Sequence, residues 1–284
     1  MNSKMFILLP VYNRHELTQE FVNQLIRQTY SNYHLILIDD GSTDGTSEMV
    51  KEYVPSVTVL TGKGDWWWAG SLQKGLEWLA NDTTINDSDL VLMINDDVRF
   101  APDYLESAVR VMKSKQGTLV LSQNLDSQTG KVCESGITVD FNSMRFDLAE
   151  SQQQINCLET RGLFIHWSDV KVIGGFYPRI LPHYLSDYEY TIRAYRRGLK
   201  CETSPEVVLE LNHETTGYHG VEEKSFLLFL KKFFSIKNSQ NPIYWTSFIL
   251  LTSGVSKNPV LTLRSFARVW KNAAKSIFSA LRKS

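Results

Sequence analysis

The sequence predicts an α/β protein in which a mostly parallel central sheet is flanked by helices, with a helical appendage at the C-terminal end. Two observations predict the sheet. Short apolar runs alternate with longer amphipathic stretches over the first 122 residues, and these runs are rich in Val, Ile and Leu, as strands covered on both faces should be. The appendage is predicted because residues 224–284 mix bulky apolar residues with cations at helical spacing.

Five strands and five helices are expected before the appendage. The strands are Met5–Leu9, Leu35–Ile38, Val57–Leu60, Leu90–Ile94 and Thr118–Leu121. The helices are Glu16–Gln28, Thr46–Tyr53, Ser71–Leu79, Pro102–Met112 and, after an irregular stretch, Asp187–Arg197, which is followed by a glycine suited to a helix C-cap. We therefore expect one domain over residues 1–223, with halves at 1–122 and 123–223, and a tail at 224–284.

The charge of the chain is divided unevenly between these two parts. The tail carries eight Lys, three Arg and no Asp or Glu, whereas the first 223 residues hold the other 19 basic residues and all 31 acidic ones, a net charge of −12. This pattern predicts an acidic body with a basic tail facing an anionic surface. The apolar run Ile243–Leu251 is far below the roughly 20 residues that span a bilayer, so we expect surface attachment to an anionic membrane. Nothing else resembles a nucleic-acid-binding module, and we expect no nucleic-acid partner.

Cysteine usage and the first residues indicate a cellular setting. The three cysteines lie far apart and form no CxxC pair, which argues against a disulfide framework or a zinc site. The apolar run in MNSKMFILLP is too short for a signal peptide. We expect a reducing, cytoplasmic location.

Polar residues follow the first two expected strands, in the segments LPVYNR and IDDGSTDGT. Ligands bind beyond the carboxyl ends of parallel strands. Tyr12 could stack on a nucleobase, and a carboxylate at Asp39 or Asp40 could accept the imide N–H of uracil or thymine. The alternative is a turn with a helix cap, since Asp, Gly and Ser are common turn residues.

The acidic triplet Asn95-Asp96-Asp97 directly follows the apolar segment LVLMI. Hard oxygen ligands at a strand end suit Mg²⁺ or Mn²⁺. Such an ion would bridge the oxygens of a diphosphate and stabilise the charge on a leaving group. The alternative is again a turn, with an aspartate as the N-cap of the next helix.

Three consecutive tryptophans stand in GKGDWWWAGSLQKG, residues 62–75. They cannot all face one core. Indole rings offer flat apolar faces for sugar rings and an N–H for a hydroxyl, so we expect this segment to line a donor or acceptor pocket. Half-buried packing at a domain seam is the alternative.

Together these motifs resemble the family 2 glycosyltransferases of the GT-A fold over roughly residues 5–213. LPVYNR, LIDDGSTDGT, NDD, YLSDYEYTIRAYRRG and a downstream His213 occur in the order and approximate spacing of that family. The resemblance implies that residues 1–122 bind the nucleotide and that residues 123–223 form the acceptor-side half. With its Trp-rich segment, the chain resembles those family members that build bacterial surface polysaccharides, including rhamnosyltransferases.

The resemblance also implies a metal site at the triplet. Asn95 stands where relatives have Asp, which makes Asp97, with help from Asp96, the expected ligand of Mg²⁺ or Mn²⁺. His213 resembles a histidine that in some relatives approaches the metal or diphosphate. A neutral imidazole there could serve as a ligand or as a hydrogen-bond donor.

The general base is expected in the later acidic motif. Relatives commonly have Glu-Asp, where this chain has Ser186-Asp187, and Asp187 falls at the position of the base. A place in the first turn of a helix would favour its ionised form. Glu189, two residues further on, remains an alternative base.

The remaining expected site residues divide into two groups. We expect the donor nucleotide to contact Pro10, Tyr12, Asn13, Asp39, Asp40, Trp67, Gly70 and Asp96. We expect the acceptor to contact Trp68, Trp167 and Tyr184.

The expected function is inverting, metal-dependent transfer of a sugar from a nucleoside-diphosphate sugar, either dTDP-rhamnose or a UDP-hexose. The expected acceptor is a glycan or lipid-linked saccharide at the inner face of the cytoplasmic membrane. A sugar nucleotidyltransferase is one alternative, although its glycine-rich basic phosphate loop after the first strand is missing. A non-catalytic carbohydrate- or membrane-binding protein is another, although it would need neither a metal motif nor a base.

Overall fold

The computed structural model describes residues 3–134, 136–211, 225–253 and 259–283. The elements of the first half are β1 Met5–Val11, α1 His15–Leu25, β2 Tyr33–Asp39, α2 Thr46–Tyr53, β3 Val57–Thr61, α3 Trp67–Asn81, β4 Leu90–Met93, β5 Val98–Arg99 and α4 Tyr104–Met112. The next elements are β6 Thr118–Asp126, β7 Val132–Glu134, β8 Ile137–Asp140, β9 Arg145–Leu148, a 3₁₀ turn at Gln152–Gln154, β10 Leu163–His166, α5 Trp167–Ile173, α6 Ser186–Arg196 and β11 Lys200–Leu211. The C-terminal helices are α7 Phe226–Phe233, α8 Pro242–Thr252 and α9 Pro259–Lys283.

A single large sheet forms the centre of the protein, in the strand order β3-β2-β1-β4-β10-β6-β11-β5, with β7 paired to β6. Strands β1 to β4 pair in parallel, and β11 is parallel to β6. Strand β10 runs antiparallel between β4 and β6, which the sequence did not predict. The predicted fold class, a GT-A type α/β protein with a C-terminal helical appendage, is confirmed. Because β1, β2 and β4 are parallel, the segments that follow them meet at one edge of the sheet.

The strands bury side chains on both faces, as their continuous apolar sequences require. Along β1, Ile7 and Leu9 face the cluster that α1, α2 and α4 cover, while Phe6 and Leu8 face the cluster under α3, α5 and α6. Helix α3 lies very close to the sheet at Gly75, where a Cβ atom would come within 2.9 Å of a Leu8 methyl carbon. A residue without a side chain at this position is therefore what lets α3 approach β1 so closely.

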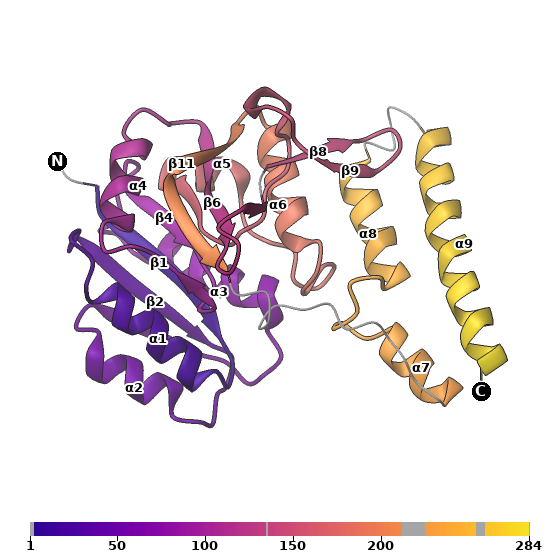
Figure 1. Cartoon of the computed structure of the whole chain (residues 1–284), viewed down its shortest axis with the longest axis horizontal. Helices are drawn as coiled ribbons and strands as arrows, with labels where there is room; N and C mark the ends of the chain where they lie inside the picture. The colour runs from indigo at the N-terminus through magenta and orange to yellow at the C-terminus, as the bar shows by residue number, and fades with distance from the viewer. Residues whose placement is uncertain (1–2, 135, 212–224, 254–258, 284) are drawn as a thin grey trace.

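The C-terminal helices stand to one side of the sheet, with α9 outermost (Figure 1). They are not a detached unit. Phe248 and Ile249 of α8 share a hydrophobic cluster with Ile192 of α6 and Val139 of the β8–β9 hairpin. Within the residues that the structure describes, no helix combines the length and the apolar character needed to cross a bilayer.

Candidate active site

A cavity of about 290 Å³ opens at the edge of the sheet where β1, β2 and β4 end. Its walls include Pro10, Tyr12, Asp40, Trp67 and Asp96, all of which the sequence assigned to the donor nucleotide. They come from four segments that are distant in sequence. The parallel pairing of β1 with both β2 and β4 is what brings three of these segments together.

A second cavity of about 160 Å³ adjoins the first. Trp68, Asn95 and His183 line both, so the two cavities lie side by side, and together they are called the cleft below. Asp187 and Tyr184 lie in the second cavity. The expected base and two expected acceptor residues thus lie beside the expected donor residues.

The Asp40 carboxylate organises the loop that carries the tryptophans. Its Oδ1 accepts the backbone N–H groups of residues 64 and 65, at 3.0 and 3.2 Å, and its Oδ2 accepts those of Trp66 and Trp67, at 2.9 and 3.1 Å. Asp39 lies behind it, outside the cavity, and accepts from the N–H of Ser42 and the hydroxyl of Ser47. Both aspartates therefore hold loops and helix starts, as the turn-and-cap alternative predicted for this segment.

The three tryptophans take different environments. Trp66 packs against the core, Trp67 lines the cleft, and Trp68 does both. The Nε1–H of Trp68 donates to Thr160 Oγ1 at 3.0 Å, which joins the loop to the far wall.

Trp67 has a positive φ of 56°. Among the described residues, four non-glycine residues have positive φ; Trp67 lines the cleft, and Asn13 and Leu185 directly follow Tyr12 and Tyr184 of its wall. Such backbone strain is typical of functional sites.

The acidic triplet turns its side chains in different directions. Asn95 faces both cavities, and Asp96 accepts from Arg14 Nε and from Thr18 Oγ1 at 2.9 Å. Burial raises the pKa of the Asp96 carboxyl, while Arg14 and Thr18 lower it. Asp97 faces a separate cavity of about 40 Å³ that Asp96 also lines, and its Oδ2 lies 3.2 Å from Arg14 Nη2. Asp97 and Asp187 thus share no cavity; Asn95 lines the cavity of Asp187, and Asp96 lines the cavity of Asp97, while both line the first cavity.

The triplet has one feature that fits a cation. Oδ1 of Asp97 is buried and has no hydrogen-bond partner. A buried carboxylate oxygen without a donor is costly, and a hard cation is one partner that would satisfy it. Across the described residues, no three His, Cys, Asp or Glu side chains converge as a complete ligand set. His213, the expected additional ligand, lies outside the described residues.

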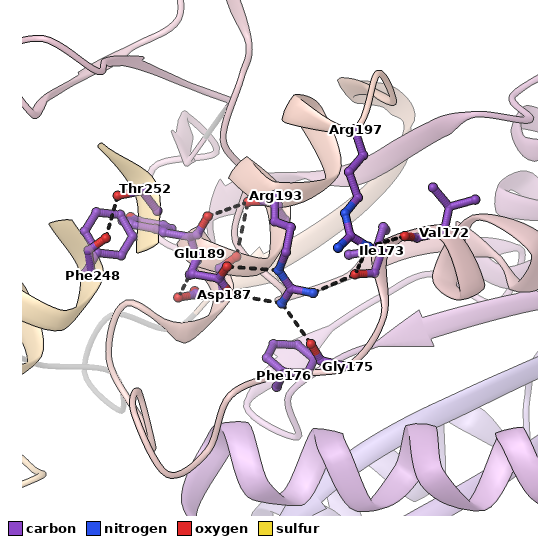
Figure 2. Close-up of polar contacts among 12 residues, drawn as sticks. Val172, Ile173, Gly175, Phe176, Asp187, Glu189, Arg193, Arg197, Phe248 and Thr252 are labelled. Atoms are coloured by element: carbon purple, nitrogen blue, oxygen red, sulfur yellow. Dashed lines mark hydrogen bonds and ion pairs between the residues drawn. The ribbon is translucent and has the colours of Figure 1, made fainter. Parts of the chain in front are cut away.

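Figure 2 shows the two rival carboxylates on α6. Glu189 is only 3% exposed, and both of its oxygens lie 2.9 Å from the guanidinium of Arg193. Arg193 also donates to the carbonyls of Ile173 and Gly175, at 2.6 and 2.8 Å. Glu189 therefore belongs to a buried network that ties α6 to the end of α5. Asp187 lies in the first turn of α6 and faces the cleft.

His183 lies at the junction of the two cavities. Burial, with a smaller contribution from Lys237, lowers its pKa to about 4, so the ring is neutral at physiological pH. Its ring centroid is 5.9 Å from that of Trp67 and 4.5 Å from that of Tyr184. This leaves the cleft wall polar but uncharged at His183.

Several expected residues do not line the cleft. Trp167 is buried, and its backbone N–H donates to the carbonyl of Asp89. Asp89 precedes β4, at the end of the strand opposite to the cleft edge. We therefore remove Trp167 from the acceptor site. Asn13 accepts the N–H of Thr43 beside the cleft, and Gly70 packs under Trp66 without reaching the cavity.

The cleft also contains residues that the sequence did not single out. They are Ser71, Glu159, Thr160, Arg161, His183 and Lys237. Glu159 and Thr160 come from the irregular stretch before β10, which carries no motif. Lys237 comes from the tail that charge patterning had assigned to a surface. Only His183 could have been suspected from the sequence, because it stands next to Tyr184, an expected acceptor residue.

The family model for glycosyl transferase family 2 matches residues 6–149, just over half of the 284-residue chain. The chain belongs to glycosyl transferase family 2. The predictions of this family and of a glycosyltransferase enzyme are thereby confirmed.

One curated relative matches over most of the chain. It is the glycosyltransferase AglE of Haloferax volcanii, 25% identical over 246 residues, which covers 84% of this chain and 73% of AglE. Other curated glycosyltransferases match over 48 to 55 residues with 34% to 40% identity, and there the chain spans only 7% to 20% of their length.

Solved structures share the fold. TarS 1-349 of S. aureus in complex with UDP is 16% identical, with a TM-score of 0.61, covering 99% of this chain and 91% of that one. The mannosyltransferase PcManGT of Pyrobaculum calidifontis, in complex with GDP-Man and Mn²⁺, is 14% identical, with a TM-score of 0.56, covering 99% and 79%. At these identities the likeness establishes the architecture of the chain.

Proposed function

We propose that this protein transfers a sugar, with inversion, from a nucleoside-diphosphate sugar to a hydroxyl of a glycan or lipid-linked acceptor. The observation that carries the proposal is the pair of adjoining cavities: Tyr12, Asp40 and Trp67 line one, Asp187 lines the other, and Trp68 and Asn95 line both. A donor in the first cavity and an acceptor in the second would meet at this junction. The TarS and PcManGT structures hold UDP and GDP-Man, which supports a nucleotide-sugar donor.

A divalent metal, Mg²⁺ or Mn²⁺, is part of the proposal. Asp97 would hold it through the oxygen that lacks a partner, with Asp96 beside it, and PcManGT contains Mn²⁺. Because Asp96 also lines the donor cavity, an ion held beside it would supply charge stabilisation for a departing diphosphate. Arg14 contacts both carboxylates. When a cation binds, we expect the Arg14 side chain either to move away or to share the two carboxylates with the cation. His213 remains a predicted further ligand.

Asp187 is the proposed general base. Its place in the first turn of α6 favours the carboxylate form, and Trp68 and Tyr184 beside it offer surfaces for an acceptor sugar. The carboxylate would take the proton from the acceptor hydroxyl as that oxygen attacks the anomeric carbon. Glu189 is excluded from the proposal because Arg193 occupies both of its oxygens.

The test compares two carboxylates in the same cavity. Asp187→Asn should lower kcat by at least about 100-fold while leaving binding of the nucleoside diphosphate within about twofold of wild type. Glu159→Gln is the matched control, because Glu159 lines the cavity of Asp187. Its kcat should fall by less than about tenfold. An active Asp187→Asn enzyme, or an equal loss in both variants, would remove Asp187 from the role.

The identity of the donor is open to a direct screen. We propose dTDP-rhamnose or a UDP-hexose, used in bacterial surface polysaccharide synthesis, because of the tryptophan-rich loop. Incubation of each sugar nucleotide with Mn²⁺ and acceptor should release nucleoside diphosphate. Release of pyrophosphate would indicate a nucleotidyltransferase instead, and binding without release would indicate a carbohydrate-binding protein.

Helix α9 carries the membrane part of the proposal. Its exposed apolar residues are Val260, Leu263, Trp270, Phe278 and Leu281. At 3.6 residues per turn these positions fall within an arc of about 80°. The cations Arg264, Lys271, Lys275 and Arg282 fall directly beside that arc. An apolar stripe flanked by cations suits a helix that lies in the surface of an anionic membrane.

We propose that α9 attaches the enzyme to the cytoplasmic face of such a membrane, where a lipid-linked acceptor is presented. Sedimentation with anionic and neutral vesicles tests this. A Lys271→Glu/Lys275→Glu variant should lose at least about tenfold in binding to anionic vesicles, at about 1 kcal/mol per cation. The matched control is Lys51→Glu/Lys113→Glu, with two exposed lysines away from α9. Equal sedimentation of both variants, or self-association through the apolar stripe, would contradict the attachment.

A further inference from the structure

The loop between α7 and α8 brings a basic residue of the tail back to the cleft. Lys237 lines the same cavity as Tyr12, Asp40 and Asp96, although more than 130 residues separate it from each of them in sequence. Its Nζ lies 5.8 Å from the centre of the Trp67 ring. The body of the enzyme and its basic appendage therefore meet at the donor side of the cleft.

The loop is held in one conformation by buried groups. Asn238 and Asn241, 4% and 1% exposed, each hydrogen-bond backbone atoms of the turn through both side-chain ends. The Nε1–H of Trp245 donates to the carbonyl of Ser239 at 2.9 Å. The backbone on both sides of Lys237 is thus anchored, and its exposed side chain extends to the cavity wall.

Of the two basic residues that line this cavity, Arg14 and Lys237, only Arg14 forms ion pairs within the described residues. Arg14, the other basic residue of the wall, is engaged by Asp96 and Asp97. No carboxylate in the described part of the chain forms an ion pair with Lys237, and its ammonium is beside the Trp67 indole. His183 is neutral and cannot contribute a positive charge. An anionic group entering this cavity would therefore meet the exposed ammonium of Lys237, which has no carboxylate partner among the described residues, while Arg161 lines the adjoining cavity.

We infer that Lys237 binds the diphosphate of the donor and of the leaving nucleoside diphosphate, so that the C-terminal segment completes the donor site. The inference rests on the proposed function and names a residue for it. A lysine meets a phosphate as a compact point charge with three donors. Removal of this segment would then weaken donor binding in addition to any effect on membrane attachment.

Calorimetric titration of the full chain with UDP, dTDP and GDP, each compared with its nucleoside and with Mn²⁺ present, tests the inference. Lys237→Ala should weaken binding of the preferred diphosphate at least tenfold and change nucleoside binding less than twofold. Lys237→Arg should stay within about threefold of wild type. Lys231→Ala, at an exposed lysine of α7 in the same basic segment, should bind as wild type does.

Each outcome decides between the two claims. A wild-type protein that binds no diphosphate of the panel contradicts the proposed function, and the inference falls with it. A wild type that binds, with a Lys237→Ala variant of equal affinity, overturns the inference alone. Equal weakening for nucleoside and diphosphate also overturns it, because Lys237 would then act on the shape of the pocket. Thermal unfolding of the variants at wild-type temperature excludes a folding defect.

Discussion

Replacement of Asp40 by Asn tests how the cleft is assembled. The carboxylate is 6% exposed and accepts four backbone N–H groups from residues 64–67. An amide has one oxygen to accept hydrogen bonds, and its NH₂ group would face donors. Asp40→Asn can therefore keep about two of the four hydrogen bonds and opposes the other two.

The expected loss is large for a change of one atom. A hydrogen bond to a charged group contributes about 1.5–3 kcal/mol, so the loss of two lowers the free energy of unfolding by about 3–6 kcal/mol. The loop would also lose the contacts that place Trp67 at the cavity wall. Donor binding should weaken together with stability.

Urea denaturation followed by circular dichroism measures the effect. Asp65→Asn is the matched control, because Asp65 is an exposed aspartate of the same loop, and its free energy of unfolding should stay within about 0.5 kcal/mol of wild type. A loss below about 1 kcal/mol for Asp40→Asn, with an unchanged slope in urea, would refute the role given to the carboxylate.

Three further predictions concern the packing around the cleft. Glu189→Gln should lower the free energy of unfolding by about 3–5 kcal/mol, because it leaves Arg193 buried without its carboxylate; a variant as stable as wild type in urea would contradict this. The pKa of His183 is lowered to about 4, so the unfolded chain binds this proton below about pH 6.5 and the folded chain does not. The free energy of unfolding should fall by up to about 3 kcal/mol as the pH drops from 6.5 to 4. A His183→Gln variant whose thermal unfolding keeps the same pH dependence would show that His183 does not cause this fall. Gly75→Ala should cost about 1–3 kcal/mol, because its Cβ would meet Leu8, and wild-type thermal stability would show that the contact relaxes freely.

The regular elements of the first half follow closely from local sequence. All five expected strands and all four expected helices of that half occur, because strands buried on both faces and amphipathic helices carry distinct apolar patterns. The deviations are at element ends and at β5, a two-residue strand that the sequence did not predict. Helix α3 begins at Trp67, four residues before the expected Ser71, because Asp40 accepts the N–H groups that would otherwise be unsatisfied there. These hydrogen bonds come from a residue that directly follows β2, so the local sequence of α3 does not predict them.

In the candidate site, too, some residues could be predicted from local sequence and others could not. The motif segments around Tyr12, Asp40 and Asp187 could be found from sequence, since each stands next to an element whose end is recognisable. The choice between Asp187 and Glu189 could not, because it depends on Arg193 and on carbonyls at the end of α5.

The sequence by itself determined the fold class, the family resemblance and the segments that surround the cleft, because periodicity and motif spacing are local properties of the chain. Tertiary structure decided that β10 inserts in reverse between β4 and β6, that Trp167 lies at the wrong end of the sheet, and that Lys237 returns from the tail to the donor cavity. Each of these depends on contacts between segments far apart in the chain. Such contacts are selected by shared burial and hydrogen bonding, which no single stretch of residues encodes.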